Sequence, residues 1–249
     1  MLPCYVMLDL ETTGGNPVHD RITEIAAVRM EDGREVARWS SLVNPGTTIP
    51  IFIQNLTGIS NDMLQEAPGF DEVAPHLLDL LDGAVLVAHN VRFDHSFLLN
   101  EFARMNVALR IKTLCTVRLS RQLYPQHKGH GLDAIMQRHN LTTLARHRAM
   151  GDVDMVLAWL GVAAQELGTE QVSCHAQTLM QSSAALPPHL DTDVSQIPDT
   201  AGVYIFFWRR SAALVHWQKY QAAQPGDVAL SGGYAGGARD AHCPGNPAH

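Results

Sequence analysis

The chain has 249 residues, of which 46% are hydrophobic, and its net charge is −7. This length and composition indicate a protein with a real core, large enough for one α/β domain and a smaller second part. No apolar run approaches membrane-spanning length, and the first predicted strand starts too close to Met1 for a signal peptide. The four scattered cysteines form no C-x-x-C pair, so we expect a cytoplasmic protein without a disulfide framework.

The first predicted strand, Cys4–Leu10, carries Asp9 and Glu11 at its end. Residues two apart on a strand point the same way, so both carboxylates face one side. They repel each other unless a cation lies between them, and Mg²⁺ or Mn²⁺ prefers such oxygen ligands. An Asp-x-Glu pair also occurs on solvated strands, so it indicates a metal site only together with further motifs.

Two strands and a helix are predicted next. Ile22–Met30 and Val36–Val43 are expected to form a meander with the first strand, with a turn at Glu31–Gly33. The segment Phe70–Leu81 is amphipathic and predicts a helix. Periodicity alone therefore predicts the α/β class.

The apolar run Ala84–Ala88 predicts a further strand, and Asp94 follows it at the start of a helix. Phe97 and Phe102 recur at helical spacing in that helix. Functional sites in α/β sheets are usually assembled at such strand-to-helix junctions. The alternative is that Asp94 is an ordinary helix N-cap.

The stretch Arg104–Arg148 is basic although the whole chain is acidic. It contains nine Lys or Arg residues and a single acid, Asp133. A positive surface beside a metal site would attract a phosphate backbone, whereas the alternative is a solvated helical face. We expect the first, because the stretch leads directly into the next motif.

The third motif is His147–Asp152, which follows two predicted short helices, Arg118–Leu123 and Leu132–Arg138. Asp152 is expected to cap or begin the apolar helix that extends to Leu167. His147 lies five residues earlier, where Gly151 and the loop are expected to let it swing. By itself, His147 could equally be a surface histidine.

Taken in order, D-x-E, H-N-x-x-F-D and H-x-x-x-x-D resemble the three exonuclease motifs of the DEDDh family. The motif residues are Asp9, Glu11, His89, Asn90, Phe93, Asp94, His147 and Asp152. Within this family the chain looks most like the proofreading epsilon-type subunit of bacterial DNA polymerase III. The resemblance runs from about Pro3 to Gln165 and implies a ribonuclease H-like fold, a mixed sheet flanked by helices.

The resemblance implies a metal-dependent 3′→5′ exonuclease that releases nucleoside 5′-monophosphates. His147 would take the proton of the attacking water, since imidazole titrates near neutral pH. Two Mg²⁺ or Mn²⁺ ions, roughly 3.5–4 Å apart, would straddle the scissile phosphate. Their ligands would be Asp9, Glu11, Asp94 and Asp152. The predicted substrate contacts are Thr12, Thr13, Asn90, Phe93, Arg146 and Arg148.

The expected substrate is the 3′ end of a single-stranded nucleic acid, with DNA favoured. Ribonuclease T-like and oligoribonuclease-like enzymes carry the same constellation, so RNA trimming is the nearest alternative. A third alternative is a non-catalytic module that tethers a polymerase or a repair complex. Four mutually repelling carboxylates argue against that module, because a scaffold has no reason to keep them.

Beyond the exonuclease domain, residues 1–167, the sequence changes character. Residues 168–197 are predicted to be a helix, Glu170–Gln181, and a linker rich in Ser, Ala and Pro. Residues 198–207 contain Pro-x-x-x-Gly-Val-Tyr, which resembles the first strand of a UvrC-type GIY-YIG nuclease domain. The Tyr-Ile-Gly strand, helix arginine and metal-binding glutamate of that family do not follow.

A shift of the reading frame would explain this absence. If one nucleotide is discarded before Trp208, permitted codons encode GEEALPLYIGKSIK, which contains the missing Tyr-Ile-Gly. Trp208 and Trp217 each force a Gly in that frame, including the Gly of Tyr-Ile-Gly. We therefore predict that residues 208–249 are a frameshift product without a stable fold. Residues 198–207 would then be a remnant strand without its sheet.

Overall fold

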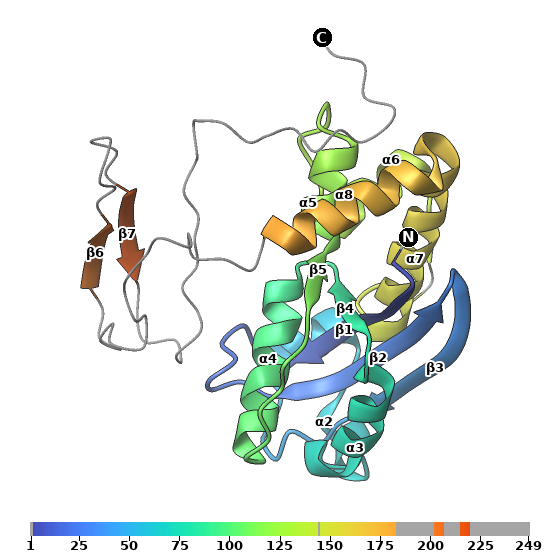
Figure 1. The fold of residues 1–249 in the computed structure, drawn as a ribbon. Helices are drawn as coiled ribbons and strands as arrows, with labels where there is room; N and C mark the ends of the chain where they lie inside the picture. Colours follow the sequence, from blue (N-terminus) through green and yellow to red (C-terminus); the bar gives the residue numbers. More distant parts are fainter. Residues whose placement is uncertain (1, 144, 183–201, 207–214, 220–249) are drawn as a thin grey trace. The chain divides into compact units, whose positions relative to one another are not determined.

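The computed structural model describes residues 2–143, 145–182, 202–206 and 215–219 (Figure 1). They belong to two units, residues 2–182 and the pair of strands 202–206 and 215–219, which are described separately. The predicted linker and most of the predicted frameshift product lie outside the described residues. Within the described part of the chain, no helix is long and apolar enough to cross a membrane.

The first unit is built on a five-stranded sheet with the order β3-β2-β1-β4-β5 (Figure 1). β1 (Cys4–Thr12) pairs antiparallel with β2 (Ile22–Glu31), which pairs antiparallel with β3 (Arg34–Leu42). On its other side β1 pairs in parallel with β4 (Val85–Ala88), and β4 with β5 (Thr113–Cys115). The mixed sheet confirms the predicted fold class. The sequence did not predict β5, because three residues are too few to show a strand pattern.

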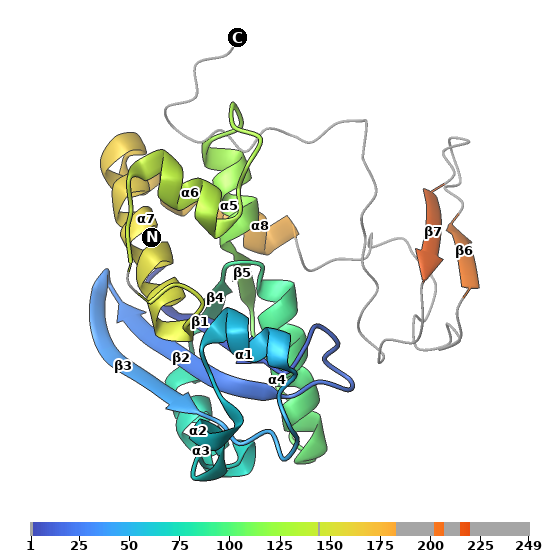
Figure 2. The same cartoon turned by 180° about the vertical axis from the view of Figure 1, so that it is seen from behind.

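Helices cover both faces of this sheet (Figures 1 and 2). One face packs against α3 (Phe70–Leu81) and α4 (Val91–Arg104). The other face packs against a layer of four helices. These are α5 (Thr116–Leu123), α6 (Leu132–His139), α7 (Ala149–Leu167) and α8 (Thr169–Ser182).

The alternation of side chains along β1 decides where its acids point. Val6 and Leu8 belong to the core beneath α3 and α4, whereas Tyr5 and Met7 belong to the core beneath α7. Because side chains alternate along a strand, Asp9 and Glu11 continue the row of Tyr5 and Met7. Both acids therefore face the α7 side of the sheet.

Two short helices, α1 (Ile51–Thr57) and α2 (Asn61–Gln65), connect β3 with α3 (Figure 2). They enclose a small separate core of four aliphatic residues, Ile49, Ile53, Ile59 and Leu64. Gly58 ends α1 with a φ of 71°, a conformation that glycine adopts without steric cost. The sequence did not predict these helices, because neither is long enough to show a helical period.

Two predicted helix starts are wrong by several residues. α4 begins at Val91 after Asn90, so Asp94 lies inside the first turn and does not cap the helix. α7 begins at Ala149, so Asp152 is likewise inside a first turn. In both cases the helix extends back towards the preceding loop. Each carboxylate lies close to the end of β1.

The second unit is a two-stranded antiparallel sheet of β6 (Gly202–Phe206) and β7 (Val215–Lys219). Tyr204 lies opposite Trp217. The prediction of a strand without a sheet is therefore wrong, and β7 falls within the stretch predicted to lack structure. β6 pairs with β7 because an extended segment needs a second extended segment to satisfy its backbone hydrogen bonds.

Candidate active site

Three acids meet at the end of β1 on the α7 side. Asp9 and Glu11 come from β1, and Asp152 comes from the first turn of α7. One carboxylate oxygen from each lies within 4.8 Å of the others. Residues far apart in the sequence thus form one group of oxygen donors.

Asp94 joins this group from α4 but lies outside the three-acid cluster. Its side chain is buried, and its charge raises the pKa of Asp9, so the two carboxylates lie close together. Burial raises the pKa of Asp94 to about 7, although the backbone N–H groups of Leu10 and of Asp94 itself oppose this rise. The structure therefore brings all four predicted acids to one place.

Burial and mutual repulsion disfavour the ionised form of these acids. Burial, followed by the charges of Asp94 and Asp152, raises the pKa of Asp9 well above its usual value. Burial also raises the pKa of Glu11 to about 8 and raises that of Asp152, where Arg146 acts in the opposite direction. Such a group of desolvated carboxylates needs a cation if it is to stay ionised at neutral pH.

The donor set fits a hard divalent cation. Every donor is a carboxylate oxygen, as Mg²⁺ and Mn²⁺ prefer. In addition, Asp152 Oδ1 is buried and has no hydrogen-bond partner among the described residues. A buried acceptor without a partner is costly, and a bound cation would satisfy it.

The raised pKa values predict how the metal-free protein responds to pH. Between about pH 4 and pH 8 the folded state holds protons on Asp94 and Glu11 that the unfolded chain has released. Raising the pH therefore favours the unfolded state, and the free energy of unfolding should fall over this range. We expect a lower melting temperature at pH 8 than at pH 5 in EDTA, measured by circular dichroism.

The matched control is Asp94→Asn, which should weaken this pH dependence in EDTA. Saturating Mg²⁺ should also weaken it in the wild-type protein, because bound cations keep the carboxylates ionised. A pH dependence that neither change alters would show that other groups cause it.

His147 lies in the segment between α6 and α7, next to the acids. Its backbone has a φ of 61°, an uncommon conformation for a residue with a side chain. Its Nδ1 lies 3.5 Å from Nη1 of Arg146. The side chain is half-buried, so water can reach the imidazole. A histidine held in this position can act as a general base without being a metal ligand.

Gly151 has a different role from the predicted one. It lies inside α7, where a Cβ atom would stand 2.0 Å from the carbonyl oxygen of Ala145. The segment that carries His147 therefore packs directly on the backbone of α7. Gly151 allows a close approach and does not act as a hinge.

Gly151→Ala is expected to push this segment away from α7 and to displace His147. A displacement of about 1 Å at a catalytic group can lower kcat by roughly 10²-fold. We expect kcat to fall with little change in KM, measured by digestion of a 5′-labelled single strand. Gly161→Ala is the control, because a Cβ at that position of the same helix meets nothing within 4 Å. Equal kcat values for the two variants would contradict the role of Gly151.

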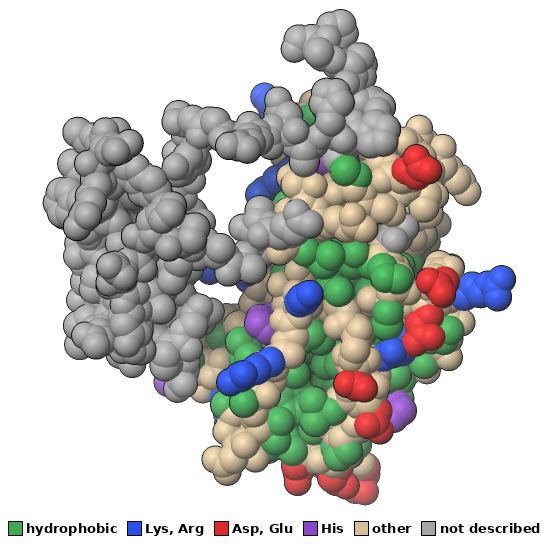
Figure 3. All heavy atoms as spheres, in the orientation of Figure 1, with side chains coloured by type: hydrophobic (Ala, Val, Ile, Leu, Met, Phe, Trp, Pro, Cys, Tyr) green, Lys and Arg blue, Asp and Glu red, His purple; other side chains and the backbone are tan. Residues whose placement is uncertain are grey.

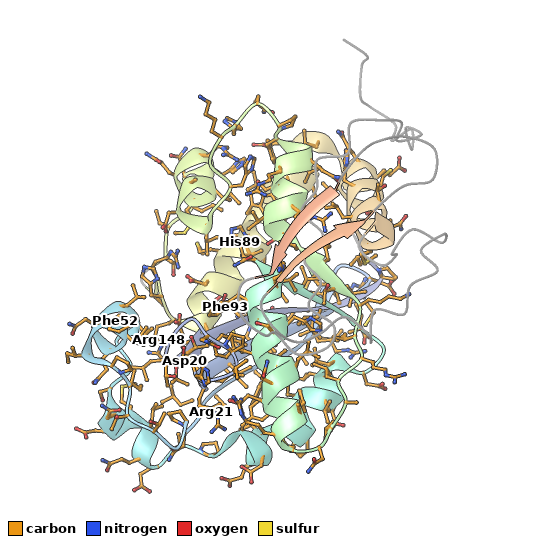
Figure 4. All side chains as sticks on the ribbon, turned by 90° about the vertical axis from the view of Figure 1, so that its left-hand side faces the viewer. Asp20, Arg21, Phe52, His89, Phe93 and Arg148 are labelled. Atoms are coloured by element: carbon orange, nitrogen blue, oxygen red, sulfur yellow. The ribbon has the colours of Figure 1, made fainter. Side chains whose placement is uncertain are left out.

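The predicted substrate residues fall into two groups. The Thr12 and Thr13 side chains are buried, and their hydroxyls bond within the following loop, to Gly14 O at 2.6 Å and to Asp20 Oδ1 at 3.4 Å. They shape this loop and offer a substrate little beyond the backbone. Phe93 lies in the first turn of α4 (Figure 4). Asn90 is the residue before this helix. Phe93 is half-buried, whereas Asn90 is exposed with a φ of 83°.

The two predicted arginine contacts are both paired with acids. Arg146 contacts Asp152 and donates Nε–H to Asp133 at 2.9 Å. Arg148 bonds to the buried Glu24 of β2, with its closest contact at 2.6 Å (Figure 4). Both guanidinium charges are therefore partly neutralised by acids in this structure, and their contact with a substrate stays a prediction.

The basic residues of the stretch 104–148 are spread over several elements. Besides Arg146 and Arg148, Arg104 pairs with Glu101 on α4 at 3.3 Å, and Lys112 lies at the start of β5, at the other end of the sheet. On the face shown in Figure 3, Lys and Arg side chains stand apart from one another. A positive surface beside the metal site therefore stays a prediction.

Sequence reasoning missed Glu24 and gave no role to His89, although His89 is one of the motif residues. Glu24 also accepts a hydrogen bond from the N–H of Ala149 at 3.0 Å, so it ties β2 to the start of α7. His89 Nδ1 lies 2.9 Å from Thr116 Oγ1, and burial lowers the pKa of His89 to about 4 (Figure 4). An acid inside the apolar strand Ile22–Met30 was a signal that could have identified Glu24.

The family model RNase_T, described as Exonuclease, matches residues 6–160. A PolC-type DNA polymerase III from Caldanaerobacter subterraneus is 34% identical over 197 residues, which cover 78% of this chain and 14% of the relative. The 3′-5′ exonuclease DinG of Bacillus subtilis is 40% identical over 153 residues, 61% of this chain and 16% of the relative. The chain thus corresponds to a small part of these longer proteins. The comparisons give no support to the GIY-YIG resemblance of residues 198–207.

Solved structures show the same fold. Exonuclease X in complex with 5′ overhanging duplex DNA aligns with a TM-score of 0.57 and 25% identity, covering 72% of this chain and 99% of that one. The zinc-bound form of E. coli ExoI in complex with single-stranded DNA aligns with a TM-score of 0.61 and 18% identity. That alignment covers 69% of this chain and 44% of the other, and it bears on the fold alone.

Proposed function

The chain belongs to the RNase_T family of exonucleases, and we propose that it is a metal-dependent 3′→5′ exonuclease acting on DNA. The observation that carries this proposal is the convergence of Asp9, Glu11, Asp94 and Asp152 from three separate elements. The product would be a nucleoside 5′-monophosphate released from the 3′ end. His147, at the edge of the acids, completes the set of groups that such hydrolysis needs.

The four acids would hold two Mg²⁺ or Mn²⁺ ions, which supply activation of a water and stabilisation of the leaving 3′ oxygen. His147 accepts the proton of that water, and its half-buried position lets it pass the proton on to solvent. Phe93 and Asn90 shape the pocket for the terminal nucleotide at the start of α4. Thr12 and Thr13 set the loop beside it and offer backbone groups to the nucleotide.

DNA is the proposed substrate because of the relatives. One relative is a DNA polymerase, and Exonuclease X was solved on overhanging DNA. Since the chain covers a small part of the curated relatives, their whole activities do not carry over. RNA remains the second candidate, since the same four acids and histidine suit either backbone.

Matched 5′-labelled DNA and RNA single strands, digested with Mg²⁺, with Mn²⁺ and in EDTA, test the proposal. We expect a ladder that shortens from the 3′ end on DNA with either metal, and none in EDTA. Faster digestion of RNA than of DNA would transfer the proposal to an exoribonuclease. No digestion of either strand with metal would leave only a non-catalytic module that tethers a partner.

The same relatives support a proposal about the cellular setting. We propose a role in replication proofreading or repair in the cytoplasm, in contact with a DNA polymerase or a repair complex. The resemblance of the motifs to an epsilon-type subunit supports a polymerase partner. Co-purification of a polymerase subunit with the tagged full chain would test it.

For the C-terminal part, we propose that residues 208–249 arise from a frameshift within a GIY-YIG domain. Only the codon argument at Trp208 and Trp217 supports this. Resequencing the gene decides the matter, because an unbroken frame without a Tyr-Ile-Gly alternative would refute it. The pairing of β6 with β7 already means that part of this stretch forms a strand.

A further inference from the structure

Arg146 bridges two carboxylates of different kinds. Its Nε–H donates to Asp133 on α6 at 2.9 Å, and its Nη1 contacts Oδ2 of Asp152 on α7. The Asp133 side chain is 81% exposed, whereas the Asp152 side chain is 11% exposed. Arg146 therefore connects a solvated carboxylate with one that belongs to the proposed metal site.

The charge of Arg146 acts on the whole acid cluster. Its Nη1 contacts Asp152, one of three acids whose carboxylate oxygens lie within 4.8 Å of one another. It also occupies one oxygen of Asp152, whose buried Oδ1 has no hydrogen-bond partner within the described part of the chain. In this arrangement a guanidinium supplies part of the positive charge that a divalent cation would supply.

Arg148 cannot take this role, although it is only two residues away. Both oxygens of Glu24 accept hydrogen bonds from its guanidinium, at 2.6 to 3.2 Å. The same carboxylate accepts the N–H of Ala149, which fixes the pair to α7. Arg146 differs because its second partner is an exposed acid, to which it can move without losing all its contacts.

We propose that Arg146 is an internal counter-ion that competes with the divalent cations for Asp152 and retreats to Asp133 when they bind. The inference rests on the proposed metal site. In the metal-free protein the guanidinium limits repulsion among the acids. On metal binding, Nη1 leaves Asp152 while Nε keeps Asp133, and the protein exchanges one cation for another. Metal affinity is therefore set partly by this arginine.

Calorimetric titration of the full chain with Mn²⁺, without nucleic acid, measures the competition directly. Arg146→Gln removes the competitor and its repulsion of the metal, so Mn²⁺ should bind about tenfold more tightly, a gain of about 1.4 kcal/mol. Lys112→Gln is the control, since it removes the same charge at the opposite end of the sheet and should leave the affinity unchanged. The rise in melting temperature caused by saturating Mn²⁺ should also be larger for Arg146→Gln.

Asp133→Asn separates competition from a general effect of charge. With Asp133 neutral, Arg146 keeps only Asp152, so Mn²⁺ should bind several-fold more weakly than to wild type. In the Arg146→Gln background, the same substitution should have little effect, because no arginine remains to be held. Effects of Asp133→Asn that are equal in both backgrounds would overturn the exchange.

The outcomes also separate this inference from the metal site itself. If wild type binds Mn²⁺ and Arg146→Gln binds it no more tightly, Arg146 does not compete and the inference fails alone. If neither protein binds Mn²⁺, the proposed metal site fails. If Lys112→Gln tightened Mn²⁺ binding by the same amount, net charge alone would explain the effect. That result would overturn the inference as well.

Discussion

Asp94→Asn should abolish Mg²⁺-dependent digestion of a 5′-labelled single strand. Asp94 supplies one of the oxygens proposed to hold the metal ions, and an amide is a poor substitute for a charged ligand. Loss of metal-ion assistance removes several kcal/mol of transition-state stabilisation, so kcat should fall by at least about 10³-fold. The measurement is single-turnover digestion of the DNA strand by purified protein.

The same substitution should make the metal-free protein more stable at pH 8. Burial raises the pKa of Asp94 to about 7, so at pH 8 its ionised form opposes folding. A neutral amide of the same shape avoids this cost and still accepts the nearby backbone N–H groups. If Asp94 had a purely structural role, Asp94→Asn would lower the melting temperature at pH 8.

The control for Asp94→Asn is Asp82→Asn, which neutralises an exposed acid beyond the end of α3. It should leave kcat and stability close to those of wild type. If a clean Asp94→Asn preparation still digested the strand with Mg²⁺, the proposed mechanism would be wrong.

His147→Ala should lower kcat by about 10²- to 10⁴-fold, the usual contribution of a general base. Metal binding should stay unchanged, because His147 contributes no ligand. This combination distinguishes the base from the acids, whose loss affects both measurements. Calorimetry with Mn²⁺ and digestion of the labelled strand provide the two values.

Chemical rescue gives a sharper test of His147. In the wild type, the His147 side chain is half-buried and water can reach it. Imidazole added to His147→Ala should therefore enter the space left by the truncation and restore part of the activity. It should not restore activity to Asp94→Asn. Unchanged kcat in His147→Ala, with metal present, would assign proton transfer to another group.

The strand pattern was sufficient to place two of the acids. Alternation along β1 put Asp9 and Glu11 on one side, and the structure shows that this is the α7 side. Helix periodicity found α3 with its observed bounds. It missed α1 and β5, because segments of seven and three residues show too little of a repeat.

The partners of charged side chains could not be predicted in the same way. Arg146 and Arg148, which flank His147, were predicted to contact the substrate. In the structure Arg148 pairs with Glu24, 124 residues away in the sequence. Arg146 pairs with two acids on different helices. Such choices depend on how α6, α7 and β2 approach each other, which no local pattern records. The close contact of Gly151 with Ala145 depends on the same packing.

The position of β1 between β2 and β4 has a consequence for hydrogen–deuterium exchange. β1 is paired on both sides, so the amides around Met7 open only with the core of the sheet and should exchange slowest. The segment before α7 lies outside the sheet, and the amide of His147 is held, among the described residues, only by the Asp152 carboxylate, so it should exchange sooner than the amides of β1. Two of the four metal acids, Asp9 and Glu11, would then stand on the most protected strand, while the proton acceptor stands on a segment that opens sooner. Binding of a nucleotide should therefore be visible as protection at His147 long before any change is measurable at Asp9.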